Sequence, residues 1–541
     1  MSPAASPASR RTGRPPARTT NGRNDPVQAR RRTVPLLAVS VLATLAPALA
    51  TAPAAASPAP PAAQRPVWRD CPTERAPDLR CATLKVPLDH ARPAGEKIDL
   101  EISRLRAADP GKRRGVLLVN PGGPGGPGLT LPGAFRDALP AGVVDAYDLI
   151  GFDPRGVGAS TQIRCGLTPG EIAFERPYKK ASFARDTALT RSFAEKCRAK
   201  YGDGLKHFNT RNTARDMDAI RAALGERKIN YFGISYGTYL GAVYTQLFPH
   251  RSDRFVLDSG VDPARVWKED FRLWAQETEK AFDRWAEWTA GRNAQYGLGA
   301  TPEAVSAAFW KIIARADRKP LKLGDRLYDG AMIRAGMRSA FFTRSLAAEY
   351  MTQLRDAVAG KPVPGPPVYD FGEDFVSSMW AVTCGDENWP RDPKVYARQA
   401  ARDAARYPLY GDYVSNITPC AFWDDTAEPT TTVDNEVGAL ILHNEWDSQT
   451  PLPDGLGLRK AMKGARLALV KDGEGHGVYP GGASSCANRL ADTYLLTGRL
   501  PARDVRCAPD PVTAGQQKKP AEVPLVTPGA RGGATARALI Q

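Results

Sequence analysis

The sequence predicts an α/β fold in which a mostly parallel sheet is interrupted by an inserted helical domain. Three observations predict it. Buried-type apolar runs alternate with helical stretches between residues 115 and 258. A long block with helical spacing and no strong strand follows, and sheet-like runs then return at 438–442 and 466–470. Alternating strands and helices favour a parallel sheet covered on both faces, and the helical block between two sheet segments indicates a lid.

The N-terminal segment 1–56 is typical of a secretory signal. Residues 1–32 carry eight Arg and one Asp, and an uncharged apolar run spans 34–50. Candidate cleavage sites of the A-x-A type end at Ala50 and Ala56. A membrane anchor is the alternative, but this run contains Pro35 and Pro47 and is short for a span of ~20 residues. We therefore expect a secreted protein with no stable membrane span after cleavage, by a Sec or a Tat route.

The elements that follow can be placed in order. Residues 57–70 are expected to be a linker. The core's first part, 71–263, opens with two strand-like pieces at 82–87 and 98–103, of which the second alternates and suits an antiparallel edge. Buried strands follow at 115–119, 147–152, 230–234 and 254–258, with an amphipathic helix at 213–224. The lid is expected at 264–437, the core's second part at 438–507, and a disordered Pro/Gly/Ala-rich tail at 508–541.

The aromatic residues of the lid recur at helical spacing. They are Trp267, Phe271, Trp274, Phe282, Trp285 and Trp288. Such a stripe favours helix packing over ligand binding.

Charge and cysteine content exclude some classes of function. The formal net charge is +16, but much of the surplus lies in the N-terminal segment, and no Lys/Arg block is interleaved with aromatics. Nucleic-acid binding is therefore not expected. The eight cysteines form no Cys-x-x-Cys, which in an exported protein favours disulfides over metal. Their spacing favours four pairs in chain order: Cys71–Cys81, Cys165–Cys197, Cys384–Cys420 and Cys486–Cys507.

Residues 233–237 read Gly-Ile-Ser-Tyr-Gly, with a strand-like run before them and a helix-like stretch, 236–248, after them. Strand, sharp turn and helix are the context of a nucleophile elbow, which identifies Ser235 as a candidate nucleophile. The flanking glycines are needed because a Cβ at either position would collide with the neighbouring helix or strand. This motif narrows the fold class to the α/β-hydrolase fold.

A serine nucleophile needs a base and an acid that orients it, in the chain order Ser, acid, His. Of the five histidines, His443 and His476 follow Ser235 in the region where the sheet returns. His476 lies in a glycine-rich loop after the last strand and is the candidate base, whereas His443 ends a strand and is interpreted as structural. Asp447 follows the preceding strand and is the candidate acid, with Glu445 as its rival.

An oxyanion hole needs two backbone N–H donors aimed at one point. One is expected from Tyr236, the residue after the nucleophile, and the other from the loop 120–128, Asn-Pro-Gly-Gly-Pro-Gly-Gly-Pro-Gly. Pro124 has no N–H, so Gly123 is the candidate donor.

These motifs, taken with several others, resemble those of known peptidase families. Loop 120–125 resembles the His-Gly-Gly-Pro-Gly loop of proline iminopeptidases, with Pro121 in place of His. The further motifs are Asp-Pro-Arg-Gly-Val-Gly at 153–158, Leu-Asp-Ser-Gly-Val-Asp-Pro at 257–263, Thr-Pro at 450–451 and Gly-His-Gly at 475–477. Together, from about Cys71 to Cys507, the chain resembles the secreted tripeptidyl aminopeptidases of actinobacteria. The resemblance implies release of short peptides from free N-termini, with the lid closing the far end of the cleft.

An exopeptidase must recognise an α-ammonium group, which a desolvated carboxylate does best. Asp386 and Glu387, beside Trp380 and Trp389, are candidates; the alternative is a solvated acidic turn at a disulfide.

We therefore predict a secreted, monomeric serine exopeptidase that cleaves peptides with free N-termini without metal or cofactor; the resemblance implies that it releases tripeptides. A secreted carboxylesterase that uses the same triad is the alternative among enzymes. A non-catalytic binding protein on this fold is the alternative outside them.

Overall fold

The computed structural model describes residues 64–71, 78–173, 176–364 and 371–511. The expected signal segment, most of the expected linker and the tail from residue 512 lie outside these residues. Two boundaries differ within them. Arg69 and Asp70, expected in the linker, form an edge strand, and Asp510, expected in the tail, accepts hydrogen bonds from Ser485 at the start of a helix.

The described residues form a ten-stranded sheet in the order β1-β2-β3-β5-β4-β6-β7-β10-β11-β12. The strands are β1 (Arg69–Asp70), β2 (Arg80–Pro87), β3 (Lys97–Leu105), β4 (Gly115–Asn120), β5 (Tyr147–Phe152), β6 (Ile229–Ile234), β7 (Ser252–Asp258), β10 (Ala439–Trp446), β11 (Arg466–Glu474) and β12 (Val505–Cys507). Neighbours from β1 to β5 are antiparallel, and from β5 to β12 they are parallel. The predicted parallel sheet with an antiparallel edge is confirmed.

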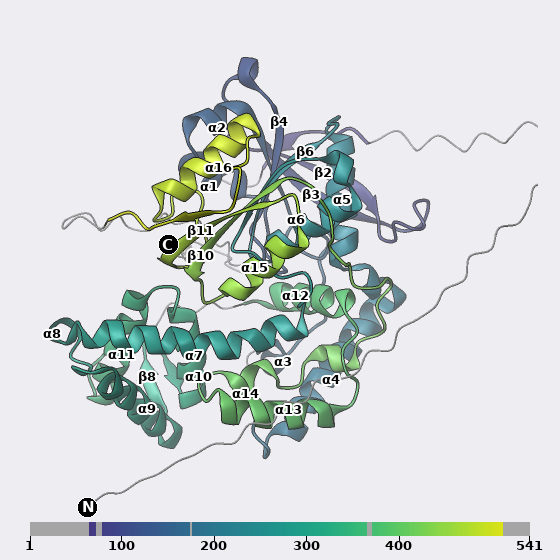
Figure 1. Cartoon of the computed structure of the whole chain (residues 1–541). Coiled ribbons are helices and arrows are strands. Elements are labelled where there is room, and N and C mark those ends of the chain that lie inside the picture. The colour runs from purple at the N-terminus through teal and green to yellow at the C-terminus, as the bar shows by residue number, and fades with distance from the viewer. Residues whose placement is uncertain (1–63, 72–77, 174–175, 365–370, 512–541) are drawn as a thin grey trace, which may run out of the picture. The chain divides into compact units, whose positions relative to one another are not determined.

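Helices cover both faces of the sheet, so the central strands are apolar on both sides. One face packs against α1 (Leu131–Ala138), α2 (Ala141–Ala146) and α16 (Ser485–Thr497). The other packs against α5 (Thr210–Ala223), α6 (Tyr236–Leu247) and α15 (Leu452–Ala461). Figure 1 shows these two layers around the sheet.

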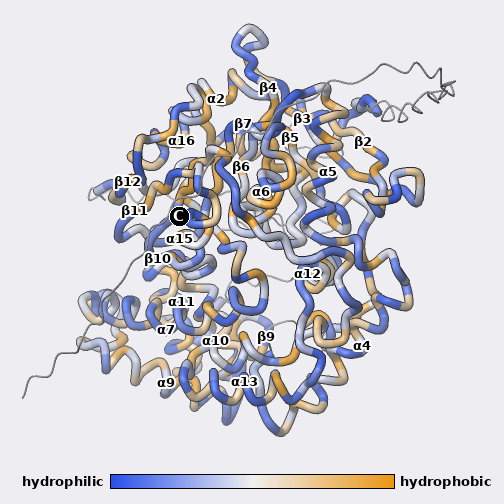
Figure 2. The backbone as a smooth tube through the Cα atoms, turned by 45° about the vertical axis from the view of Figure 1, so that its right-hand side comes forward, coloured by the Kyte–Doolittle hydropathy of each residue, from blue (hydrophilic) through white to orange (hydrophobic). Residues whose placement is uncertain are grey.

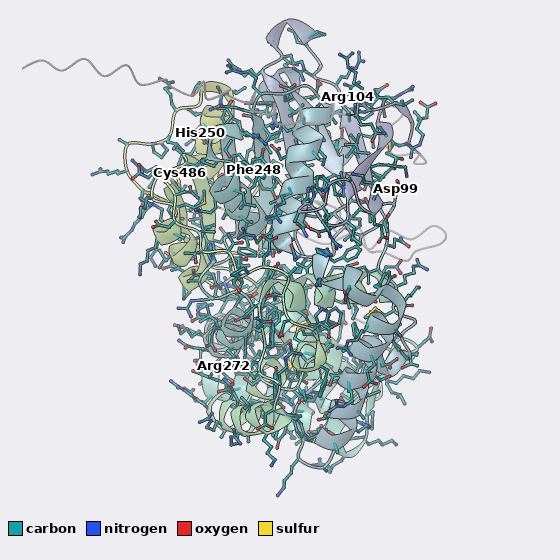
Figure 3. The ribbon with its side chains drawn as sticks, turned by 90° about the vertical axis from the view of Figure 1, so that its right-hand side faces the viewer. Asp99, Arg104, Phe248, His250, Arg272 and Cys486 are labelled. Atoms are coloured by element: carbon teal, nitrogen blue, oxygen red, sulfur yellow. A yellow bond between two sulfur atoms is a disulfide. The ribbon has the colours of Figure 1, made fainter. Side chains whose placement is uncertain are left out.

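The lid occupies the other half of the described structure (Figure 1). Its helices are α7 (Lys268–Ala290), α8 (Asn293–Tyr296), α9 (Pro302–Arg318), α10 (Gly330–Ala340), α11 (Arg344–Val358), α12 (Glu373–Asp386), α13 (Pro393–Arg406) and α14 (Gly411–Val414). They change between hydrophilic and hydrophobic positions along their length (Figure 2), as amphipathic helices do. Figure 3 labels Arg272 in this half and Arg104, Phe248 and His250 in the sheet half.

The aromatic stripe of the lid serves packing. Phe282 and Trp285 lie in a separate lid core with Phe309 and Phe341. The structure also adds a short antiparallel hairpin, β8 (Leu321–Leu323) with β9 (Arg326–Tyr328), where the sequence indicated no strong strand.

A second segment joins the lid from the region expected to be pure core. The connection from β5 to β6 contains α3 (Pro169–Ile172) and the long helix α4 (Phe183–Tyr201), which lies beside the lid (Figure 1). Phe193 of α4 packs near Trp423, and Arg198 donates to the Phe422 carbonyl and the Asp424 carboxylate. The cap over the sheet is therefore built from two stretches of chain.

The eight cysteines form the four pairs expected from their spacing: Cys71–Cys81, Cys165–Cys197, Cys384–Cys420 and Cys486–Cys507. Among the described helices, none is both long and apolar enough to cross a bilayer.

Candidate active site

The elbow lies at the carboxyl end of β6, where ligands bind in open α/β sheets. Ser235 has φ 59° and ψ −127°, a conformation that non-glycine residues rarely adopt, and it directly precedes α6. Its N–H donates to the Asp258 carbonyl (3.0 Å). A Cβ on Gly233 would lie 2.4 Å from the Gly237 carbonyl oxygen, so close backbone approach requires this glycine. The strained backbone holds the Ser235 side chain partly exposed above the sheet.

His476 and Asp447 lie together at the same edge of the sheet. Asp447 follows β10, His476 follows β11, and His476 Nδ1 is 2.8 Å from Asp447 Oδ2. Asp447 is buried and also accepts hydrogen bonds from the Gln449 N–H (2.8 Å) and from the Thr450 N–H and hydroxyl (3.1 and 3.0 Å). Burial opposes its ionisation, but the charge of His476 and these hydrogen bonds outweigh burial and lower the pKa of Asp447.

The end of β7 joins the two halves of this site. The Asp258 carboxylate accepts hydrogen bonds from the N–H groups of Val478 and Tyr479, at 2.8 and 2.7 Å. The Ser259 hydroxyl accepts one from the Gly477 N–H at 2.8 Å. Because the Asp258 carbonyl also binds the Ser235 N–H, one strand end fixes both the elbow and the histidine loop. Burial raises the pKa of Asp258 to about 7.

Sequence reasoning missed this role of Asp258. The signal available was an aspartate at the end of a strand, in the motif at 257–263.

The two alternative residues, His443 and Glu445, have other hydrogen-bond partners. His443 is fully buried, its Nδ1 accepts the Gly260 N–H (3.1 Å), and burial lowers its pKa to about 4, so it is neutral at physiological pH. Glu445 pairs with Lys471 (2.7 Å) and accepts the Asp472 N–H (2.8 Å), both of β11. In the structure, Asp447 rather than Glu445 contacts His476.

The loop after β4 lies against the elbow. A Cβ on Gly122, whose φ is +88°, would lie 2.5 Å from the Ile234 carbonyl oxygen and 3.0 Å from the Ser235 Cβ. The Gly122 N–H is engaged by Asn120 Oδ1 (3.0 Å). Among the described residues, the N–H groups of Gly123 and Tyr236 have no acceptor. Two unengaged backbone donors therefore lie on adjoining segments beside Ser235.

The lid contributes to both sides of Ser235. The Phe342 ring lies edge-on to the His476 ring at 6.0 Å, and the Phe341 carbonyl accepts the Ser448 hydroxyl (3.0 Å). On the other side, Phe375 of α12 lies beside the loop, since a Cβ added to Gly123 or Gly125 would be 3.5 Å from its ring. These contacts could not be predicted from the sequence, because they depend on how the lid is placed over the sheet.

Asp386 and Glu387 end α12 and join the lid to the core. Asp386 is buried, accepts the N–H and hydroxyl of Thr210 (2.7 and 2.6 Å) and accepts Trp267 Nε1 (3.0 Å). Burial raises its pKa to about 6.

Glu387 is partly exposed, and its Oε2 accepts the N–H groups of Trp267 and Lys268 at the start of α7. Burial raises its pKa as well. Both carboxylates thus have partners within the chain, and Glu387 Oε1 has none among the described residues.

Comparison with known proteins identifies the family. Residues 115–301 match the family model described as alpha/beta hydrolase fold, and residues 407–507 match the one described as TAP-like protein. The chain is 36% identical over 473 residues to tripeptidyl aminopeptidase of Streptomyces lividans, covering 82% of this chain and 86% of that protein. It is 29% identical to serine protease Hip1 of Mycobacterium tuberculosis (79% and 87% covered) and 31% identical to carboxylesterase B of the same species (83% and 91%). The chain therefore belongs to the tripeptidyl aminopeptidase family of serine peptidases, within the α/β-hydrolase fold.

Proposed function

We propose that this protein removes short peptides, tripeptides above all, from free N-termini with a catalytic triad of Ser235, His476 and Asp447. The observation that carries the proposal is the His476–Asp447 pair, fixed by one strand end to the strained Ser235. Because Nδ1 of His476 is hydrogen-bonded to Asp447, Nε2 remains available to accept the proton of the Ser235 hydroxyl.

The proposed reaction has two steps. In the first, Ser235 Oγ attacks the scissile carbonyl, its proton passes to His476 Nε2, and the N–H groups of Gly123 and Tyr236 bind the oxyanion. His476 gives this proton to the leaving nitrogen as the C–N bond breaks, which leaves the acyl-enzyme. In the second step, a water loses a proton to His476 and attacks the acyl carbon, and Ser235 recovers its proton as the peptide leaves. Asp447 stays ionised and stabilises the imidazolium.

The substrate assignment rests on the name of the Streptomyces relative and on the lid. Glu387, with Asp386 behind it, is the proposed partner of the substrate's α-ammonium group, because Glu387 Oε1 is unengaged in a partly desolvated position. Export follows from the signal-like segment 1–56 and accords with four disulfides.

The triad is tested by three substitutions. Ser235→Ala and Asp447→Asn are each expected to lower kcat by about 10⁴-fold or more, while Glu445→Gln stays near wild type. All three proteins are purified free of host esterases and checked for folding by circular dichroism. A Ser235→Ala protein that keeps a tenth of the activity would place the nucleophile elsewhere.

The exopeptidase assignment is tested with one tripeptide anilide, free and then N-acetylated. Acetylation removes the ammonium charge and leaves a desolvated carboxylate unpaired, which is expected to lower kcat/KM by roughly 30-fold to several thousand-fold. Glu387→Gln is expected to shrink this difference more than Asp386→Asn, because Asp386 is engaged by Thr210 and Trp267. Similar values for both substrates would contradict the exopeptidase assignment.

A carboxylesterase is the second candidate, favoured by the relative of that name at 31% identity. The same triad would serve it, but it has no use for an ammonium group. Short esters turned over faster than every free tripeptide, without any effect of the Glu387 substitution, would favour this candidate.

A further inference from the structure

A cavity of about 190 Å³ lies beside the loop after β4. Three segments line it. Gly125 and Pro127 come from that loop, Val157 and Gln162 from the loop after β5, and Asp374 and Phe375 from the start of α12 in the lid. Its walls therefore come from the loop that carries Gly123, from the neighbouring strand end, and from the cap.

Hydrogen bonds hold these three walls together. The Asp153 carboxylate accepts the N–H groups of Gly128 and Leu129 (2.9 Å each) and of Ala159 (2.7 Å), so it joins the two core loops. The Ser378 hydroxyl of α12 donates to the Gly156 carbonyl at 2.5 Å, which joins the lid to the β5 loop. The cavity is thus built by buried polar contacts and does not depend on loose packing.

A salt bridge and two hydrogen bonds hold the N-terminal end of α12 in place. Arg164 pairs with Asp374 at 2.5 Å, and Glu373 accepts the N–H groups of Gly166 and Leu167. Asp374 therefore lines the cavity with one oxygen already paired.

The order of the strands sets the cavity's place relative to the reaction. Along the carboxyl edge, β5 and β4 lie on one side of β6, and β7, β10 and β11 lie on the other. The cavity is at the ends of β5 and β4, whereas His476 is at the end of β11. Ser235, at the end of β6, lies between them.

The chemistry then assigns the two sides. In the tetrahedral intermediate the leaving nitrogen must face His476, because it receives its proton from the imidazole. The oxyanion points to Gly123 and Tyr236, so the remaining substituent, the acyl Cα, is directed away from His476. That direction leads to the ends of β4 and β5.

We propose that this cavity is the subsite for the side chain of the residue whose carbonyl is attacked, and that it takes an uncharged aliphatic side chain or a single aromatic ring. The inference rests on the proposed Ser235–His476 chemistry and specifies the residue accepted at the cut.

Size and lining define the occupant. A dry apolar cavity of about 150 Å³ accommodates benzene, so about 190 Å³ accommodates a leucine, methionine or phenylalanine side chain. Val157, Pro127 and Phe375 supply apolar surface. Asp374 disfavours an acidic side chain, because a second carboxylate would lose its hydration beside a like charge.

The test varies that residue alone, in free tripeptide anilides Ala-Ala-X with X as Gly, Leu, Phe or Glu. Wild type is expected to prefer Leu and Phe over Gly and Glu by about 10-fold or more in kcat/KM. Val157→Phe, which fills the cavity, is expected to bring the Leu-to-Gly ratio of kcat/KM near one. Val157→Ala, which widens the cavity, is expected to raise kcat/KM for the Phe substrate relative to the Leu substrate.

Two controls separate this inference from the peptidase assignment. Val437→Phe makes the same substitution at a different cavity, near the amino ends of β6, β7 and β10, and is expected to leave the ratio unchanged. Hydrolysis of p-nitrophenyl acetate by each variant reports whether the triad is intact. If no tripeptide anilide is cleaved, the peptidase assignment fails, and the same variants are compared on p-nitrophenyl acetate and 4-methylpentanoate.

A Leu-to-Gly ratio, or the matching ester ratio, that neither Val157 variant changes would overturn the inference. So would Val157 variants that change the dependence on the residue after the cut in longer peptides, since the cavity would then serve the leaving group.

Discussion

At the scale of single residues, the close approach of Gly122 to the elbow has a testable cost. A Cβ on Gly122 would lie 2.5 Å from the backbone oxygen of Ile234, a buried strand residue. The φ of Gly122, +88°, is also unfavourable for any residue with a side chain. Gly122→Ala is therefore expected to shift the loop and the adjoining Gly123 N–H. Loss of one oxyanion donor lowers kcat by about 10²–10³-fold. Steady-state kinetics on the folded variant measure this.

Gly225→Ala is the matched control. Gly225 has φ +75°, but nothing lies within 4 Å of its added Cβ, and it follows α5, far along the chain from the loop. This variant is expected to lose about 1 kcal/mol of stability from backbone strain and to keep wild-type kcat. Equal losses of kcat in both variants would contradict the role given to Gly122.

Sequence alone could name the residues of the site but could not choose among all of them. Asp447 and Glu445 both follow the strand predicted at 438–442, and spacing does not say which side chain turns to His476. The choice depends on the sheet: Glu445 faces Lys471, whereas Asp447 is buried beside the imidazole. Contacts made by Phe342 and Asp258 could not be predicted, because they join segments distant in the chain.

At the scale of elements, α7 of the lid meets α15 of the core through two buried carboxyls, Asp270 and Asp454. Burial is the main cause that raises the pKa of Asp270 to about 7, and burial and the charge of Asp270 raise that of Asp454. Asp262, Arg265 and Arg338 are the other charged groups that act on the pair.

Because the unfolded pKa of an aspartate is about 3.9, the folded protein holds extra protons on this pair above that pH. Their stabilisation is complete below about pH 4 and is lost as pH rises through about 7. Asp454→Asn removes one of the two titrating groups. The stability of this variant relative to wild type is therefore expected to increase between pH 5 and pH 8.

Urea unfolding at several pH values measures this difference. Asp434→Asn, at an exposed position paired with Lys463, is the control and is expected to show no such trend. A difference between Asp454→Asn and wild type that stays constant from pH 5 to pH 8 would contradict the interpretation.

The strands were predictable because fully buried strands are continuous apolar runs, as at 115–120 and 229–234. The attachment of α4 to the lid was not, since local spacing identifies a helix but not the neighbour against which it packs. The hairpin of β8 and β9 has three residues per strand, too few for a clear alternation.

At the scale of the whole molecule, each disulfide joins cysteines close in sequence, and none links the lid helices α7–α14 to the sheet. The lid is therefore held on the core by packing and hydrogen bonds, including those of Asp386. Cys384–Cys420 closes 36 residues within the lid, with Cys384 on α12, and Cys486–Cys507 closes 21 residues at the sheet edge.

Removal of either disulfide by paired Cys→Ser substitution is expected to lower the free energy of unfolding by about 3–4 kcal/mol, on the chain-entropy model.

The effects of the two disulfide removals on activity should differ. Without Cys384–Cys420, α12 is less firmly held, so the wall that Phe375 forms beside the oxyanion loop is lost part of the time. A tripeptide needs that wall, whereas p-nitrophenyl acetate needs only the triad and the hole. Hence kcat/KM for the tripeptide should fall several-fold more than for the acetate in the lid variant, and by the same factor for both in the sheet-edge variant. Parallel kinetics on the two substrates, at a temperature where both variants are folded, decide this; equal losses in the lid variant would mean that α12 is fixed without its disulfide.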